Sequence, residues 1–83
     1  MEAALTRLAQ KKKAGHLNWR VSIVDLLKLL DMDSSTQARR QLAQKLDVNI
    51  GQVGSSERNT ALHAAVWREL AENGGRVPPN MRD

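Results

Sequence analysis

Residues 17–48 have the sequence LNWRVSIVDLLKLLDMDSSTQARRQLAQKLDV, and this stretch decides the fold class. At the helical repeat, Trp19, Ile23, Leu26, Leu27 and Leu30 fall on one wide face of its first half. Further apolar residues lie outside that face, and a helix that is apolar nearly all round is normally buried. We therefore expect a central buried helix, followed by an amphipathic helix with a basic outer face.

Side chains that cap helices predict where these two helices begin. Asn18 is expected to cap the first of them, because its side-chain oxygen can accept from an unpaired backbone N–H. Ser22 with Asp25 forms a capping box that offers a later start. Ser34, followed three residues later by Gln37, predicts the start of the next helix.

Glycine and serine residues mark the other boundaries. Gly15 is expected to end the first helix of the chain, because glycine tolerates the left-handed conformation at this position. Ser55 or Ser56 is expected to begin the last helix. The connection before it carries three apolar residues that we expect to pack back against the core: Val48, Ile50 and Val53.

These boundaries predict an all-α fold, a four-helix orthogonal bundle with short loops. The 83 residues suffice for one domain. We place this domain at residues 1–78, with helices at about 2–14, 19–31, 35–47 and 56–73, and expect residues 79–83 to be a frayed tail.

Several motifs together resemble a known bacterial family. These are LNWR at 17–20, SIVDL at 22–26, DSS at 33–35, and LAENGG at 70–75 followed by Val77 and Pro78. The chain resembles domain of unknown function family 3597 over roughly residues 2–78. It departs from the family pattern at Ala61 and Trp67, where bulk looks exchanged between neighbouring positions. The resemblance implies a helical bacterial protein, and it assigns no catalytic residues.

Composition limits the compartments and partners. The chain has no cysteine, which fits a reducing cytoplasm and excludes disulfides and thiolate metal sites. No apolar run is long enough to cross a membrane. The net charge of +4 permits contact with anionic partners without identifying one.

Catalytic and metal-binding patterns are weak. The residues D-x-D-x-S at 31–35 resemble the start of a calcium loop, but the sixth and twelfth positions are Thr36 and Leu42 instead of glycine and glutamate. His16 and His63 each stand alone, and His63 is best explained as a hydrogen-bonded structural residue. Serines near His63 are explained by helix capping. We expect no enzyme activity, no cofactor and no metal.

The remaining hypothesis is an interaction surface. Trp19 and Trp67 are expected to fill the core of a chain that has no Phe or Tyr. Apolar residues outside the core face of the buried helix suggest a non-enzymatic module that binds an unknown protein, as a monomer or with weak self-association. The alternative is a helix-turn-helix that reads nucleic acid with the third helix, although aspartates stand beside that helix. The candidate surface residues are Arg20, Val21, Val24, Leu29, Gln37, Arg39, Arg40 and Lys45.

Overall fold

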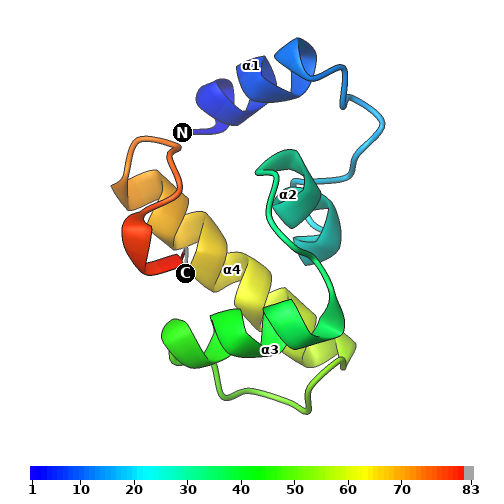
Figure 1. Cartoon of the computed structure of the whole chain (residues 1–83), viewed down its shortest axis with the longest axis vertical. Coiled ribbons are helices and arrows are strands. Elements are labelled where there is room, and N and C mark those ends of the chain that lie inside the picture. Colours follow the sequence, from blue (N-terminus) through cyan, green and yellow to red (C-terminus); the bar gives the residue numbers. More distant parts are fainter. Residues whose placement is uncertain (82–83) are drawn as a thin grey trace.

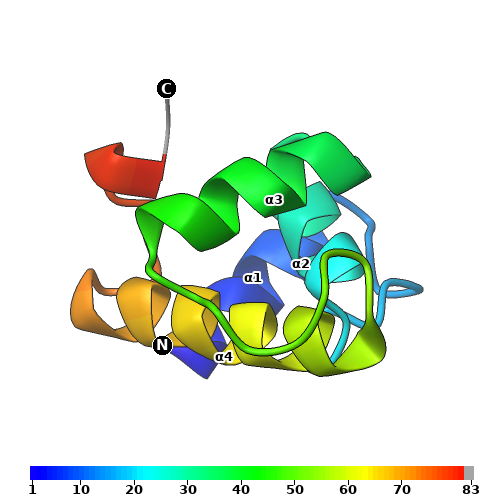
Figure 2. The same cartoon turned by 90° about the horizontal axis from the view of Figure 1, so that it is seen from below.

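A computed structural model gives the conformation of residues 1–81. Within that range the chain is all-α, as the sequence predicts, and every regular element is helical. The long helix α4 crosses the molecule, with α1 and α2 toward one end and α3 toward the other (Figures 1 and 2). The elements are α1 (Glu2–Lys11), α2 (Ile23–Leu29), α3 (Thr36–Lys45), α4 (Ser56–Glu72) and the 3₁₀ turn η1 (Pro79–Met81).

Three of the four α-helices begin at a serine whose hydroxyl accepts a backbone N–H three residues ahead. Ser22 caps α2, so the later of the two predicted starts is correct and the start at Asn18 is wrong. The start of α3 lies one residue beyond the predicted Ser34, because Ser35 supplies the capping hydroxyl. Ser55, one of the two serines predicted to begin the last helix, caps α4.

Three helices end at a residue other than glycine in the left-handed conformation. Lys13, Asp31 and Asp47 have φ values of 55°, 58° and 58°, and they follow α1, α2 and α3 respectively. In each case the next residue donates its N–H to a carbonyl five residues back, as Ala14 does to Ala9 at 2.8 Å. This Schellman geometry shortens the predicted helices, and Gly15 is not the residue that stops α1.

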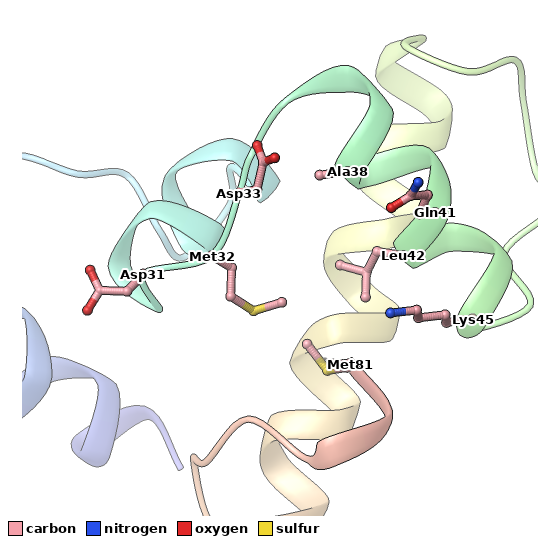
Figure 3. A pocket seen from close by; sticks show the side chains of 8 residues that line it. All are labelled: Asp31, Met32, Asp33, Ala38, Gln41, Leu42, Lys45 and Met81. Carbon is pink, nitrogen blue, oxygen red and sulfur yellow. The ribbon is translucent and has the colours of Figure 1, made fainter. Parts of the chain in front are cut away.

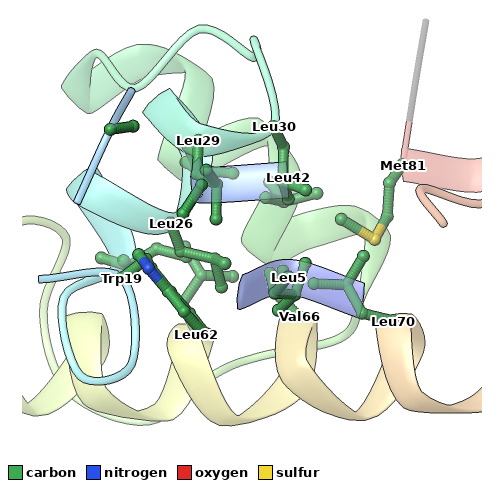
Figure 4. Close-up of a cluster of buried hydrophobic side chains, with 14 of the residues drawn as sticks. Leu5, Trp19, Leu26, Leu29, Leu30, Leu42, Leu62, Val66, Leu70 and Met81 are labelled. Carbon is green, nitrogen blue, oxygen red and sulfur yellow. The ribbon is translucent and has the colours of Figure 1, made fainter. Parts of the chain in front are cut away.

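The core consists mostly of aliphatic side chains and lies around α2. Leu26, Leu27 and Leu29 are fully buried, which confirms that this helix is apolar on more than one side. Figure 4 shows side chains from all parts of the chain meeting here, including Leu5 from α1 and Leu62 from α4. A helix surrounded in this way leaves only a narrow strip for solvent, and Lys28 occupies it.

The expectation of a frayed C-terminal tail is wrong for residues 79–81. These residues form η1, and the Met81 side chain is buried in the core cluster beside Leu70 (Figure 4). Pro78 is buried as well, and its carbonyl accepts the Met81 N–H at 3.1 Å. The remaining two residues of the predicted tail, 82–83, lie outside the described range.

Polar contacts fasten α1 to the other helices. The Lys12 ammonium donates to the Leu29 carbonyl at 2.6 Å and lies 2.6 Å from an Asp31 carboxylate oxygen, so it neutralises the C-terminal end of α2. At the opposite end of α1, Ala4 packs against Gly75 so closely that a Cβ on Gly75 would lie 2.9 Å from the Ala4 Cβ.

Candidate interaction surface

The apolar residues proposed for the surface of α2 differ in their exposure. Leu29 is fully buried, so its assignment to a surface is wrong. Val24 is half-buried and packs against the core. Val21, in the turn before α2, is 68% exposed. The α2 region therefore offers one exposed valine and not an apolar patch.

Arg20 lies beside Val21 and is largely engaged within the molecule. Its guanidinium stacks over the Trp19 ring at 4.2 Å from the centroid. It also lies 3.2 Å from a Glu2 carboxylate oxygen and donates to the Thr6 hydroxyl at 3.3 Å. Arg20 thus joins α1 to the chain before α2, although its side chain is half accessible to solvent.

Arg39 is a structural residue and not a free recognition group. Its guanidinium donates to the Asn59 side-chain oxygen at 2.9 Å and so bridges α3 to α4. It also donates to the Ser34 carbonyl and the Thr36 hydroxyl. These bonds leave Arg39 half-buried, and Arg40 is the arginine of α3 that faces solvent.

The α3–α4 connection shows what the sequence interpretation missed. Val48 packs against the core as expected, but Ile50 and Val53 are 57% and 48% exposed. Arg58 in the first turn of α4 donates to the Ile50 carbonyl and the Gly51 carbonyl, both at 2.7 Å. The connection is therefore fixed from α4 while two of its apolar side chains remain in contact with water.

Val53 and the outer face of α3 enclose an open groove of about 540 Å³. Gln37 and Arg40 lie in its lining, so two of the residues proposed from sequence do share a surface. Within residues 1–81 the Arg40 guanidinium makes no ion pair. The other lining residues are Thr36, Gln41 and Gln44. The groove combines one apolar side chain, one cation and several amide or hydroxyl groups.

Lys45 borders a different cavity, of about 400 Å³, between the α2–α3 connection, α3 and η1. Figure 3 shows Met32, Leu42 and Met81 around this cavity, with the Lys45 ammonium near Met81. Gln41 lines both this cavity and the groove beside Val53. Of the proposed residues of α3, Gln37 and Arg40 thus line the groove and Lys45 lines the cavity, whereas Arg39 lines neither.

The two tryptophans and His63 form one stack. The Trp19 and Trp67 rings lie 5.9 Å apart at 14°, and the Trp67 and His63 rings lie 5.5 Å apart at 25°. His63 Nε2 is 3.0 Å from the Trp19 carbonyl oxygen, which can only accept, so Nε2 carries the hydrogen and donates it. The stack packs α4 against the chain before α2, with Trp19 buried and Trp67 half-buried.

The acidic residues between α2 and α3 serve helix ends. Asp31 pairs with Lys12, and an Asp33 carboxylate oxygen accepts the Ser35 N–H at 2.9 Å. Hydrogen bonds from the Ser35 backbone and side chain hold the pKa of the exposed Asp33 carboxyl below its ordinary value. Residues 1–81 contain no group of three or more His, Asp or Glu side chains placed to hold a metal ion.

Positive charge is concentrated in one part of the chain. Residues 7–28 hold six of the 13 Lys and Arg residues but one of the nine Asp and Glu residues. This segment covers most of α1, the α1–α2 connection and most of α2. Six basic residues and one acidic residue give this segment a charge of +5 against +4 for the whole chain, so the other residues sum to −1, although α3 among them carries three basic residues and no acidic residue.

Comparisons with known proteins give one match. The model of a family described as Domain of unknown function (DUF3597) matches residues 1–78. The search for a similar curated protein and the search for a similar solved structure found no match. In the part of the chain that the structure describes, none of the helices has the length and apolar character needed to span a membrane.

Proposed function

Because the chain belongs to the DUF3597 family, whose function is unknown, the proposal rests on the site itself. We propose that the domain is a non-enzymatic module that binds another protein through the groove formed by Val53 and the outer face of α3. The observation that supports this proposal is a fixed connection that leaves Val53 48% exposed beside Gln37 and Arg40. The composition without cysteine supports a cytoplasmic location for the complex.

Rigidity of the α3–α4 connection supports the choice of this groove. An apolar loop residue that is free to move would lose conformational entropy on binding. Here Arg58 holds two consecutive carbonyls, and the Ser55 hydroxyl accepts the Arg58 N–H at 3.1 Å. Gly51 and Gly54 adopt positive φ values of 72° and 84°, which set the path of the chain. Most of the conformational entropy of this surface is therefore lost when the domain folds and not when a partner binds.

The groove chemistry indicates the kind of segment that would fit. Val53 offers contact to one apolar side chain, and Arg40 offers a charge-assisted hydrogen bond to a carboxylate. Gln37 and Gln44 can pair with backbone or side-chain amides. We infer a partner segment that presents an apolar residue together with an acidic residue.

A photo-crosslinking amino acid at Gln44, which lines the groove, tests the proposal in cells of the organism that encodes the chain. We expect one discrete protein adduct, which is lost in Val53→Asp and in Arg40→Glu and retained in Val21→Asp. Val21 is the matched control because it is an exposed valine outside the groove. The purified partner should then bind the wild-type domain about tenfold or more tightly than either groove variant.

Adducts that persist in both groove variants, or a purified pair that does not bind, would refute this assignment of the surface. Circular dichroism of each variant keeps loss of folding separate from loss of binding. Both substitutions change solvent-exposed side chains, so the helical signal should remain unchanged.

Two features support the non-enzymatic part of the proposal. His63 uses Nε2 to hold the Trp19 carbonyl, so this histidine has a structural task between two elements. Ser55, one of the serines that precede His63 in the sequence, accepts the Arg58 N–H as a helix cap. Both groups are thereby accounted for by the fold.

Nucleic-acid binding through α3 is the weaker candidate. Arg39 is engaged with Asn59, and the Asp33 carboxylate lies beside the start of α3. Binding of duplex DNA at low salt that is lost in Arg39→Ala plus Arg40→Ala would favour this alternative, because phosphate contacts dominate at low ionic strength. We expect these substitutions to leave any low-salt binding unchanged.

A further inference from the structure

The outer face of α4 has a pattern that the proposed protein-binding groove does not use. Glu57, Ala64 and Arg68 are exposed, and Ala61 is half-buried beside them. These residues follow one another at intervals of four, three and four, which is the spacing of a seam that contacts another helix. The side chains at the middle of this face are small, and the side chains at its two ends carry opposite charges.

A hollow of about 540 Å³ runs beside this seam, between α4 and the start of the α3–α4 connection. Its lining includes Ala61, Ala64, Val48 and the 57% exposed Ile50. Ile50 and Val53 thus face separate hollows on the two sides of one connection. The apolar wall provided by Ile50 distinguishes this face from an ordinary solvated helix surface.

We propose that a second copy of the chain occupies this face, with the two α4 helices antiparallel about a twofold axis. In the antiparallel register that places Ala61 opposite the second copy's Ala64, Glu57 lies opposite the second copy's Arg68. The twofold axis repeats both pairs, so the same face of each copy supplies both partners of every pair. Glu57 and Arg68 are about 16 Å apart along the helix axis, and the axis of symmetry passes between the two alanines.

Charge favours an antiparallel second copy over a parallel one. Glu57 follows Ser56 at the N-terminal end of α4, and Arg68 lies toward its C-terminal end. A parallel neighbour would oppose like charges, whereas an antiparallel copy opposes unlike charges at both ends. The α4 segment contains three acidic and two basic residues, so this helix carries no excess of positive charge. The alanines at the centre allow the helix axes to approach to about 8 Å.

The experiment measures the molar mass of the intact chain by sedimentation equilibrium from about 10 µM to about 1 mM. We expect a monomer–dimer equilibrium that weakens about tenfold or more in Glu57→Arg and in Arg68→Glu, because each places like charges opposite one another. The double variant Glu57→Arg plus Arg68→Glu should restore the dimer. Raising salt to about 1 M should weaken the wild-type dimer, because these charges are exposed.

Matched controls reverse a charge outside the seam. Arg7→Glu and Lys11→Glu on α1 each reverse an exposed charge by the same amount as Arg68→Glu and should leave the dimer unaffected. A chain that stays monomeric up to about 1 mM overturns the proposal. Dimerisation that ignores the single reversals, or that the double variant fails to restore, overturns the proposed register as well. Loss of this dimer leaves the Val53 groove intact, so the two proposals can fail separately.

Discussion

Gly74 and Gly75 follow one another at the end of α4, yet they constrain the chain for different reasons. Gly74 has φ 66°, and no residue beyond its chain neighbours has an atom within 4 Å of the position where a Cβ would stand. Gly75 has φ 86°, and its Cβ position lies 2.9 Å from the Ala4 Cβ of α1. The first glycine serves the backbone conformation, and the second also permits the contact between the two ends of the domain.

These two sites provide a matched pair of substitutions. Gly74→Ala should lower the free energy of unfolding by about 1 kcal/mol, because a left-handed conformation is strained for alanine. Gly75→Ala should cost at least about 1 kcal/mol more, because the added methyl group overlaps Ala4. Urea unfolding followed by tryptophan fluorescence measures both values.

Ala4→Gly serves as the test of the cause. In a double-mutant cycle it should couple to Gly75→Ala by about 1 kcal/mol and show no coupling to Gly74→Ala. Equal costs at the two glycines, or no coupling to Ala4, would contradict the explanation by close contact.

At the scale of elements, the start of α3 depends on Asp33 and Ser35 together. Asp33 accepts the Ser35 N–H, and Ser35 accepts the Ala38 N–H at 3.2 Å. The carboxylate also lies near the positive end of the helix dipole. Because the carboxylate is the form that accepts these bonds, the pKa of Asp33 falls below its ordinary value of 3.8.

The sign of the resulting pH dependence follows from the direction of that shift. A lowered pKa in the folded state means that Asp33 adds stability above about pH 3.8 and loses this contribution as the pH falls below that value. Wild type should therefore lose more stability than Asp33→Asn between about pH 5 and about pH 3, measured by urea unfolding. Parallel pH profiles for the two proteins would contradict this role for Asp33.

Local sequence signals identified the helices, and they failed where tertiary contacts decide. The apolar faces of α2 and α4 and the serine caps are local properties, so these elements were predictable within a few residues. The helix ends were not predictable, because residue type alone does not indicate the left-handed conformation of Lys13, Asp31 and Asp47. Their next residues bury apolar groups or lie against the core, and this packing fixes the ends.

The candidate surface was only partly predictable for the same reason. Gln37 and Arg40 do line a groove. Leu29 is buried because α2 is covered on several sides, and Arg39 is engaged because α4 brings Asn59 beside it. The exposure of Ile50 and Val53 depends on Arg58, which lies several residues further along the chain, and hydrophobic patterning alone cannot reveal that bond.

At the scale of the whole molecule, individual side chains attach α1 to the other helices. Leu5 inserts into the core, Arg20 binds Glu2 and Thr6, and Lys12 reaches the end of α2. Figure 1 shows α1 at one end of the molecule, away from α3. The attachment of α1 therefore depends on a few side chains along its length.

Lys12→Met should loosen this attachment, because it keeps the apolar stem and removes the ammonium that the Leu29 carbonyl and Asp31 share. We expect a loss of about 1 kcal/mol. Amide hydrogen exchange in α1 should become faster while exchange in the middle of α4 changes less. Lys11→Met is the control, since Lys11 is the exposed last residue of α1, directly before Lys12. Equal effects of the two substitutions would contradict the assigned role.

Residues 7–28 form a basic segment with six Lys and Arg residues and one acidic residue. Figure 1 places two parts of this segment, α1 and the α1–α2 connection, at the opposite end of the long axis from the α3–α4 connection. A negatively charged body that approaches by diffusion is therefore attracted to the α1–α2 end as well as to the basic residues of α3. Contact at the α1–α2 end would leave the α3–α4 connection, which carries the exposed Ile50 and Val53, accessible to a second molecule.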